Sequence, residues 1–124
     1  KNSVSFRDLK EENSYHLFVM GMVAIMHENY YIKSNYESGD GIPDLVLKPK
    51  NKKDTAFIFE FKYSRAKDSK NLKRTAKSAL KQINDRNYAN GLKYEGYENI
   101  TKIGMGFRKK DVEVVIEAEF IIEE

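Results

Sequence analysis

The sequence has 124 residues, the usual size of one folding unit, so we expect a single core and a single site. Hydrophobic residues make up 40% and charged residues 33% of the chain, which excludes an intrinsically disordered protein, and the absence of cysteine excludes disulfides and thiolate metal sites. The net charge of +3 is too small to indicate a polyanionic partner by itself, so the distribution of charge matters more.

The first predicted element is a long apolar helix over residues 8–28, where no proline interrupts the apolar positions. Its longest apolar run, residues 17–26, is half of the ~20 residues needed to cross a bilayer. We therefore predict a mostly buried helix and no contact with a membrane. A short strand over residues 30–36 and a glycine-containing turn over residues 37–41 follow.

Two strands joined by a polar loop come next. Pro43 fixes its own φ before the first strand, residues 44–48, and Pro49 ends it. After the loop at residues 50–54, residues 56–63 alternate between two faces. One face carries Phe57, Phe59, Phe61 and Tyr63, and the other carries Ala56, Ile58, Glu60 and Lys62. The aromatic face is predicted to be core.

A second helix with a basic outer face is predicted over residues 69–86, because Leu72, Ala76 and Ile83 recur at helical spacing. The opposite side carries Lys70, Lys73, Arg74, Lys77 and Lys81. Such a stripe is often an ordinary solvated face, but its single sign also suits a nucleic-acid backbone.

The remaining chain is predicted to be a loop at residues 87–99 and two strands, at residues 100–107 and 112–122, joined by a basic turn. The expected order is helix, three strands, helix and two strands. This alternation indicates an α/β fold.

The two carboxylates of the predicted hairpin, Asp44 and Glu60, break the apolar pattern of their strands. With the hairpin centred near Lys52, Asp44 faces Glu60, and Lys62 shares their side of the sheet. Like charges so placed repel and raise each other's pKa unless a cation lies between them. Because carboxylate oxygens are hard ligands, we predict a Mg²⁺ or Mn²⁺ site rather than a zinc site.

Ile42-Pro43-Asp44, followed after fifteen residues by Glu60-Phe61-Lys62, resembles the signature of the PD-(D/E)XK nuclease superfamily. Three further segments resemble the bacterial subgroup found at the C-terminal end of ATPase-like proteins: residues 35–41, residues 79–83 with Tyr88, and Ile103-Gly104 with Phe107. The resemblance covers roughly residues 12–107. It implies a restriction-endonuclease-like αβββαβ core, in which helices flank a central mixed sheet. Ile42 departs from the pattern, since many of these domains have arginine there.

By this resemblance, Asp44 and Glu60 hold Mg²⁺ or Mn²⁺, Lys62 assists the attacking water, and a phosphodiester bond is hydrolysed. One metal or two are both compatible with the sequence. We expect DNA rather than RNA as the substrate. The alternative is a catalytically silent nuclease-fold module that binds nucleic acid or a partner protein. Degenerate members generally lose the acidic pair or the lysine, so the presence of all three residues favours activity.

The resemblance also implies supporting residues. A glutamate of the first helix often completes the metal site, and Glu12 is our candidate, with Glu11 as a close competitor. His16 lies one turn beyond Glu12 and could bond it or approach phosphate. Gln82 resembles a helix glutamine that orients the site, and Tyr88 a tyrosine that follows it.

Nucleic acid is the expected partner. Its predicted contacts are His16, Lys70, Lys73, Arg74, Lys77, Lys81 and Tyr88. The chain begins at Lys1 rather than Met, which suggests a piece of a longer protein. The resemblance implies that an ATPase-like domain precedes it. A third hypothesis is an interaction protein or homodimer in which the edge of residues 112–122 completes a sheet. The lack of cysteine is compatible with a reducing cytosol, so we expect a cytoplasmic protein.

Overall fold

The computed structural model describes residues 6–35, 42–64, 70–109 and 111–120, apart from the side chains of residues 6–14, 70 and 120. The elements in chain order are α1 (Phe6–Met26), β1 (Tyr30–Ser34), β2 (Leu45–Pro49), β3 (Ala56–Tyr63), α2 (Lys70–Asp85), α3 (Tyr88–Tyr94), β4 (Asn99–Arg108) and β5 (Asp111–Phe120). The predicted order of elements is confirmed, with α3 as an addition. The predicted turn at residues 37–41 lies outside the described residues.

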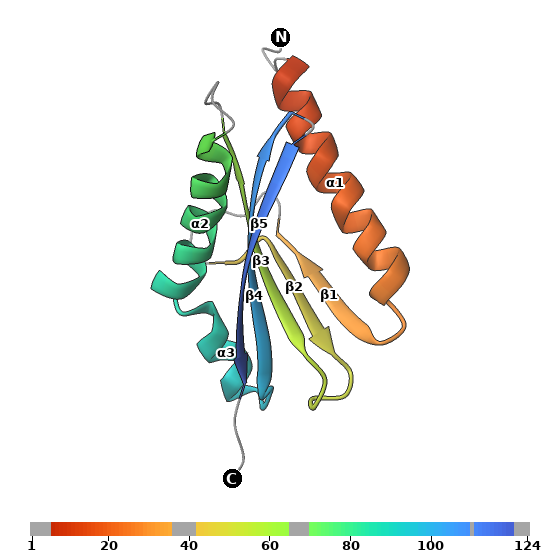
Figure 1. The fold of residues 1–124 in the computed structure, drawn as a ribbon. Coiled ribbons are helices and arrows are strands. Elements are labelled where there is room, and N and C mark those ends of the chain that lie inside the picture. Colours follow the sequence, from red (N-terminus) through yellow and green to blue (C-terminus); the bar gives the residue numbers. More distant parts are fainter. Residues whose placement is uncertain (1–5, 36–41, 65–69, 110, 121–124) are drawn as a thin grey trace.

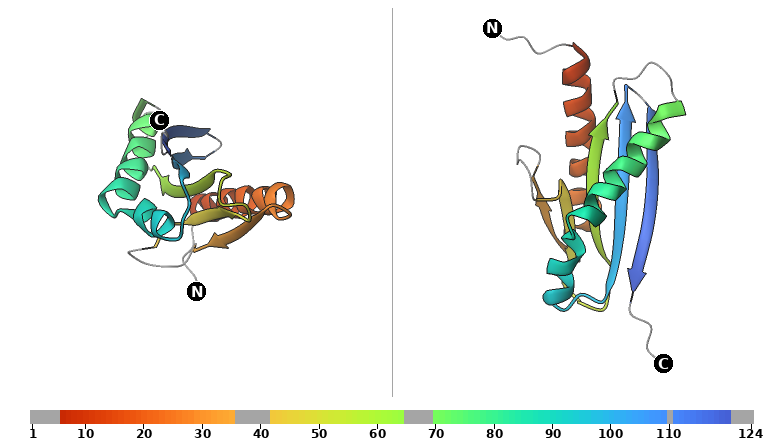
Figure 2. Two further views of the ribbon diagram at one scale, coloured as in Figure 1. Left: turned by 90° about the horizontal axis from the view of Figure 1, so that it is seen from below. Right: turned by 90° about the vertical axis from the view of Figure 1, so that its left-hand side faces the viewer.

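The sheet is mixed and has five strands in the order β1-β2-β3-β4-β5. Strands β3 and β4 are parallel, and the other neighbours are antiparallel. A parallel pair needs a crossover connection, which α2 and α3 provide. Figure 1 shows α2 and α3 on one side of the sheet and α1 on the other, and Figure 2 shows α2 crossing the sheet obliquely. The predicted central mixed sheet flanked by helices is therefore confirmed.

The face of the sheet toward α1 is an aromatic core. Phe18 of α1 meets Phe59 and Phe61 edge to face, with ring centroids 5.5 and 5.6 Å apart. Phe61 makes the same kind of contact with Phe107 of β4, at 5.7 Å. Such geometry adds to the stabilisation that burial alone gives. The aromatic row predicted along residues 57–63 contributes all four of its members to this cluster, so the predicted core face is confirmed.

The opposite face packs against α2 and α3. Ile58 of β3, Ile83 of α2, Leu92 of α3 and Ile100 of β4 are buried together there. Because successive residues of a strand point to opposite faces, Glu60 and Lys62 share this side with Ile58. The charged residues of β3 therefore lie on the side that α2 covers.

Two glycines let α2 rest directly on β4. A Cβ atom added at Gly104 would lie 2.6 Å from the backbone nitrogen of Leu80 and would also strike the carbonyl oxygen of Ala76. A Cβ atom at Gly106 would lie 2.8 Å from the carbonyl oxygen of Leu72. Neither position has room for a larger residue unless the helix moves.

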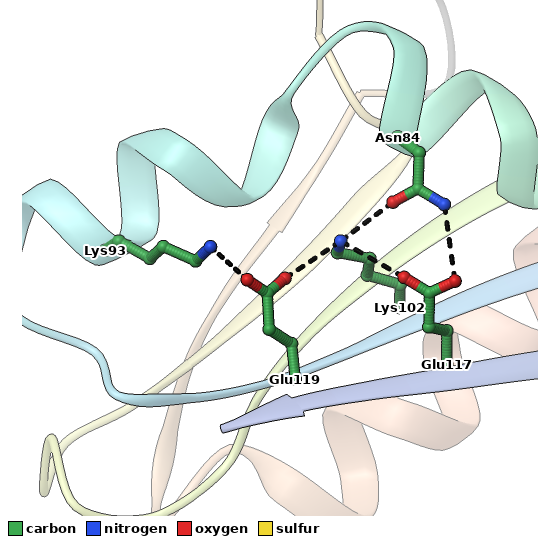
Figure 3. Close-up of polar contacts among 5 residues, drawn as sticks. All are labelled: Asn84, Lys93, Lys102, Glu117 and Glu119. Carbon is green, nitrogen blue, oxygen red and sulfur yellow. Dashed lines mark hydrogen bonds and ion pairs between the residues drawn. The ribbon is translucent and has the colours of Figure 1, made fainter. Parts of the chain in front are cut away.

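A buried lysine ties the edge strand β5 to the helices. The Nζ atom of Lys102, whose residue is 8% exposed, donates to Asn84 Oδ1 at 2.8 Å and lies 2.9 Å from Glu119 Oε2 and 3.4 Å from Glu117 Oε2. Lys93 of α3 also pairs with Glu119. Figure 3 shows the five side chains converging between α2, α3 and the last two strands. The three donors of the buried ammonium thus have acceptors.

The prediction that residues 87–99 form a loop is wrong for its first half, where α3 lies. Asn87 adopts a left-handed conformation with φ of 53°, which separates α3 from α2. Ala89 and Leu92 then bury one side of the short helix. Glycine and tyrosine among polar residues hid this helix, because its formation depends on tertiary packing more than on local propensity.

The prediction that the first helix is mostly buried is wrong for its outer side. Tyr15 is buried, but Leu17, Met20 and Ile25 are 60%, 65% and 75% exposed. Successive helical residues turn by about 100°, so a sheet on one side of α1 cannot cover a continuous apolar run. In the described part of the chain, no helix combines the length and the apolar character that crossing a membrane requires.

Candidate functional site

Asp44 lies immediately before β2 and accepts three hydrogen bonds at two of its atoms. Its carbonyl oxygen accepts the backbone N–H of Asn35 at 2.8 Å and the hydroxyl of Tyr15 at 3.1 Å. Its carboxylate oxygen Oδ2 accepts the backbone N–H of Phe61 at 2.7 Å. The hydroxyl contact links α1 to the start of β2, and the N–H contact links Asp44 to β3. The backbone of Asp44 is therefore fixed by α1 and by Asn35, and its carboxylate is fixed by β3.

Glu60 is opposite Asp44 across the hairpin. The register pairs Leu45 with Phe59 and Val46 with Ile58, which confirms the pairing predicted for Val46 and brings Asp44 beside Glu60 at the next step. The amide nitrogen Nε2 of Gln82 donates to Glu60 Oε2. The other oxygen, Oε1, is buried and has no hydrogen-bond partner in the described residues. A buried carboxylate oxygen without a donor is costly and calls for an explanation.

The pKa values of both carboxyl groups are raised. Burial raises the pKa of Glu60 from its ordinary 4.5 to about 7, and the nearby Asp44 carboxylate adds to the rise, while a hydrogen bond from the Asp44 backbone and the charges of Lys62 and Arg86 oppose it. Burial also raises the pKa of Asp44, against the N–H of Phe61 and the ammonium of Lys62. Both shifts disfavour the charged forms, and a bound cation would reverse them.

A groove lies beside the carboxylate pair, and Lys62 is part of its lining. Lys62 and Tyr63 of β3 line this groove together with Arg74, Thr75 and Ser78 of α2, and its volume is about 440 Å³. Two of these five residues are cationic. The groove is thus a positively charged approach to Asp44 and Glu60, on the side of the sheet that α2 covers.

The glycine contacts of β4 explain how Gln82 reaches its partner. Gly104 is the register partner of Glu60 on the neighbouring strand. At Gly104 the backbone of α2 touches β4. This close packing holds Gln82, two residues after Leu80 on α2, near enough to Glu60 to donate a hydrogen bond to it. Sequence reasoning quoted Gly104 as part of a motif without a role. The signal for its role was a glycine inside an apolar strand, which often marks a close backbone approach.

A family model of the PD-(D/E)XK nuclease superfamily matches residues 10–117. The chain belongs to the PD-(D/E)XK nuclease superfamily. No curated protein and no solved structure matches the sequence. The matched range contains Asp44, Glu60 and Lys62, and the observed mixed sheet with helices on both faces is consistent with the superfamily's fold. Membership indicates nuclease activity, and hence binding of nucleic acid, although some members are inactive.

In this PD-(D/E)XK domain the predicted central residues come together. Asp44, Glu60, Lys62 and Gln82 lie on one side of the sheet, with the contacts given above. Glu12 and its competitor Glu11 belong to α1, but their side chains lie outside the described residues. Among the residues that are described, no group of three or more histidines or carboxylates could hold a metal. Of the three predicted metal ligands, only Asp44 and Glu60 have side chains among the described residues.

This pair fits a divalent cation. The buried oxygen Oε1 of Glu60 lacks a donor, and both carboxyl groups have pKa values raised by burial. Hard oxygen ligands are the kind that Mg²⁺ and Mn²⁺ prefer. PD-(D/E)XK nucleases generally use divalent metals, which agrees with this donor set.

The residues of α2 that are predicted to contact nucleic acid lie in different environments. The exposed side chains on the outer face of α2 are those of Lys73, Arg74, Lys77 and Lys81, while that of Lys70 lies outside the described residues. Arg74 lines the groove beside Lys62, whereas Lys81 pairs with Asp85 one turn along the helix. The contacts of this basic face with nucleic acid stay a prediction.

Two predicted residues flank the site at its edges. His16 is exposed, and its ring lies edge to face against Tyr15, with centroids 5.5 Å apart. Tyr88 begins α3, and its hydroxyl is buried without a hydrogen-bond partner in the described part of the chain. Tyr15 itself was missed as a site residue. The signal for it was a tyrosine within an apolar helix, since a buried hydroxyl needs an acceptor.

Proposed function

We propose that this domain hydrolyses phosphodiester bonds of nucleic acid, with DNA as the preferred substrate, at Asp44, Glu60 and Lys62. The observation that carries the proposal is the buried oxygen Oε1 of Glu60, which has no donor in the described residues and lies beside a second carboxylate. The pair lowers stability when both members are charged, because burial raises both pKa values and Asp44 raises that of Glu60 further, and such perturbed groups are typical of functional sites.

Asp44 and Glu60 would hold Mg²⁺ or Mn²⁺, with Glu12 as a third ligand if its side chain reaches them. Each carboxylate has one oxygen fixed by a donor, Phe61 N–H for Asp44 and Gln82 for Glu60, and this leaves its second oxygen for a cation. When bound, such a cation lowers the pKa of its water and offsets charge on the phosphoryl group.

The chain's own residues supply orientation and charge around that centre. Gln82 keeps the Glu60 carboxylate in one orientation, which preserves its spacing from Asp44. The Lys62 ammonium can donate to the phosphate or align the attacking water, since it lies on the same side of β3 as Glu60. Arg74 lines the groove with Lys62 and would contact the next phosphate along the bound strand.

The test is cleavage of supercoiled, linear and single-stranded DNA and of RNA, with Mg²⁺, Mn²⁺ or EDTA. We expect metal-dependent cleavage that Asp44→Asn and Lys62→Met reduce by about a hundredfold or more. Asp54→Asn and Lys53→Met are matched controls, because these exposed residues lie in the loop at the far end of the hairpin. Both controls should cleave like the wild type.

A parallel measurement separates a failed assay from a wrong proposal. Mn²⁺ should raise the melting temperature of the wild type and of Lys62→Met, and it should have no such effect on Asp44→Asn. A folded wild type that neither cleaves any substrate nor responds to Mn²⁺ would contradict the proposal. It would favour the silent module that binds nucleic acid or protein.

A further inference from the structure

A cavity of about 150 Å³ lies on the side of the sheet that α2 and α3 cover, at the opposite end of the carboxylate pair from the cationic groove. Its apolar lining includes Val46 of β2, Ile58 of β3 and Leu92 of α3. Lys33 of β1 and Tyr88 of α3 supply polar groups to the same lining. Nothing in the proposed hydrolysis uses this space.

The strand register places the cavity next to the candidate site. Val46 and Ile58 are paired across the hairpin, and each is two residues from a carboxylate, Asp44 just before β2 and Glu60 on β3. Residues two apart on a strand share a face and are about 7 Å apart. The cavity, the carboxylate pair and the groove at Lys62 therefore follow one another along one side of the sheet.

The lining suits a flat ring with a polar edge. The side walls are aliphatic, and the hydroxyl of Tyr88 is buried behind the lining without a partner in the described residues, so a polar edge that displaces its cover can bond it. Lys33 is exposed at the rim, and Lys48 there is held by Glu95 at 3.1 Å. A cavity of roughly 150 Å³ is large enough to accept one six-membered aromatic ring.

A nucleobase has this chemistry, but only when it is unpaired. In a duplex the polar edge of a base is engaged by its partner and its faces are stacked, so the base must leave the helix to enter a side pocket. Apolar walls with a few placed polar groups are typical of sites for single-stranded nucleic acid and of ligand pockets in general.

We propose that this cavity binds one unpaired base of the strand being cleaved, so that the domain acts on single-stranded or locally unpaired nucleic acid. The inference rests on the proposed hydrolysis, because it assumes that the phosphate of that strand lies at Asp44 and Glu60. The base next to this phosphate then enters between β2 and α3, and the backbone continues past Lys62 and Arg74 into the cationic groove.

Gly91→Phe tests the proposal by filling the cavity. Gly91 lines the cavity from α3, and a Cβ atom added there meets nothing within 4 Å, so the first side-chain atom fits without a shift of the backbone. Asn90→Phe is the matched control, because Asn90 is an exposed neighbour on the same helix and is not part of the lining. Circular dichroism and thermal melting check that both variants fold.

The readout is fluorescence anisotropy of a labelled ten-nucleotide oligothymidine and of a labelled duplex of equal length, in EDTA. We expect the wild type to bind the single strand about tenfold or more tightly than the duplex. Gly91→Phe should weaken single-strand binding about five- to a hundredfold, the effect of losing one base contact, and leave duplex binding unchanged. Asn90→Phe should stay within about twofold of the wild type.

Tyr88→Phe provides a second variant that keeps the ring and removes only the hydroxyl, and it should weaken single-strand binding about threefold or more. A folded Gly91→Phe that binds the single strand like the wild type overturns the proposal, as does a wild type that prefers the duplex. Cleavage assays on the same proteins separate the two claims. The expected binding pattern without cleavage supports the cavity and contradicts hydrolysis, whereas cleavage unaffected by Gly91→Phe contradicts the cavity alone.

Discussion

Glu60→Gln removes a negative charge whose burial lowers the stability of the metal-free protein. Burial and Asp44 raise the pKa of Glu60 to about 7, whereas in the unfolded chain it keeps its ordinary value of 4.5. Between these two pH values the folded state binds more protons than the unfolded state. The free energy of unfolding therefore falls as pH rises through this window, and the loss is complete above pH 7.

The size of the effect follows from the shift. A rise from 4.5 to about 7 corresponds to a loss of about 3 kcal/mol of stability at pH 8, because each unit is worth about 1.4 kcal/mol. The amide of Glu60→Gln cannot ionise, and its oxygen can still accept from Gln82. We expect the variant to be about 3 kcal/mol more stable than the wild type at pH 8 and nearly equal to it at pH 4.5.

Urea unfolding followed by circular dichroism in EDTA measures this difference, with equal m-values as the check that both chains unfold alike. Glu98→Gln is the isosteric control, since Glu98 is exposed. Glu98→Gln should change the free energy of unfolding only slightly, and by the same amount at both pH values. If the wild type and Glu60→Gln showed the same pH dependence between pH 4.5 and 8, the reasoning from a buried, unpartnered carboxylate would be refuted.

Three further substitutions test how the site is held. Gly104→Ala should lower the free energy of unfolding by about 1–3 kcal/mol, because its Cβ would strike the backbone of α2. Gly91→Ala is the control and should be neutral or stabilising, because there is open space at its Cβ. Equal urea unfolding curves for the two variants would contradict the close packing at Gly104. Lys102→Met should cost about 1–3 kcal/mol by breaking the bonds that tie β5 to the helices, as thermal or urea melts would show, and an unchanged stability would mean that the network adds nothing. Tyr15→Phe should cost about 1 kcal/mol through loss of its hydrogen bond to the carbonyl of Asp44, and a variant as stable as the wild type would disprove that contribution.

The sequence predicted the parts of the fold that local patterns determine. A short loop and strict alternation fix the register of a hairpin, so the pairing of Val46 with Ile58, and the position of Asp44 beside Glu60, could be deduced. The amphipathic pattern of α2 was equally clear. For the site, the hairpin alone brought Asp44, Glu60 and Lys62 to one face, whereas the contact of Gln82 came only from the family resemblance.

Long-range packing explains what the sequence did not predict. The hydroxyl of Tyr15 reaches the carbonyl of Asp44, 29 residues away, and no periodicity signals such a contact. The burial of α3 depends on the sheet beneath it, and the exposure of Leu17 depends on which side of α1 the sheet lies. The cavity beside Val46 is likewise formed by four elements that meet only in the folded chain.

The arrangement of strands also bears on the order in which the site forms during folding. The hairpin of β2 and β3 closes a short loop, whereas β3 pairs with β4, and Glu60 with Gly104, across more than 40 residues. We therefore expect Asp44 and Glu60 to meet early, while water still screens them, and to become buried only when α2 and β4 dock. Glu60→Gln should then slow unfolding at pH 8 and leave the folding rate nearly unchanged. Stopped-flow chevron plots of the wild type and Glu60→Gln test this order. If the substitution changed the folding arm and not the unfolding arm, Glu60 would be buried before the rate-limiting step.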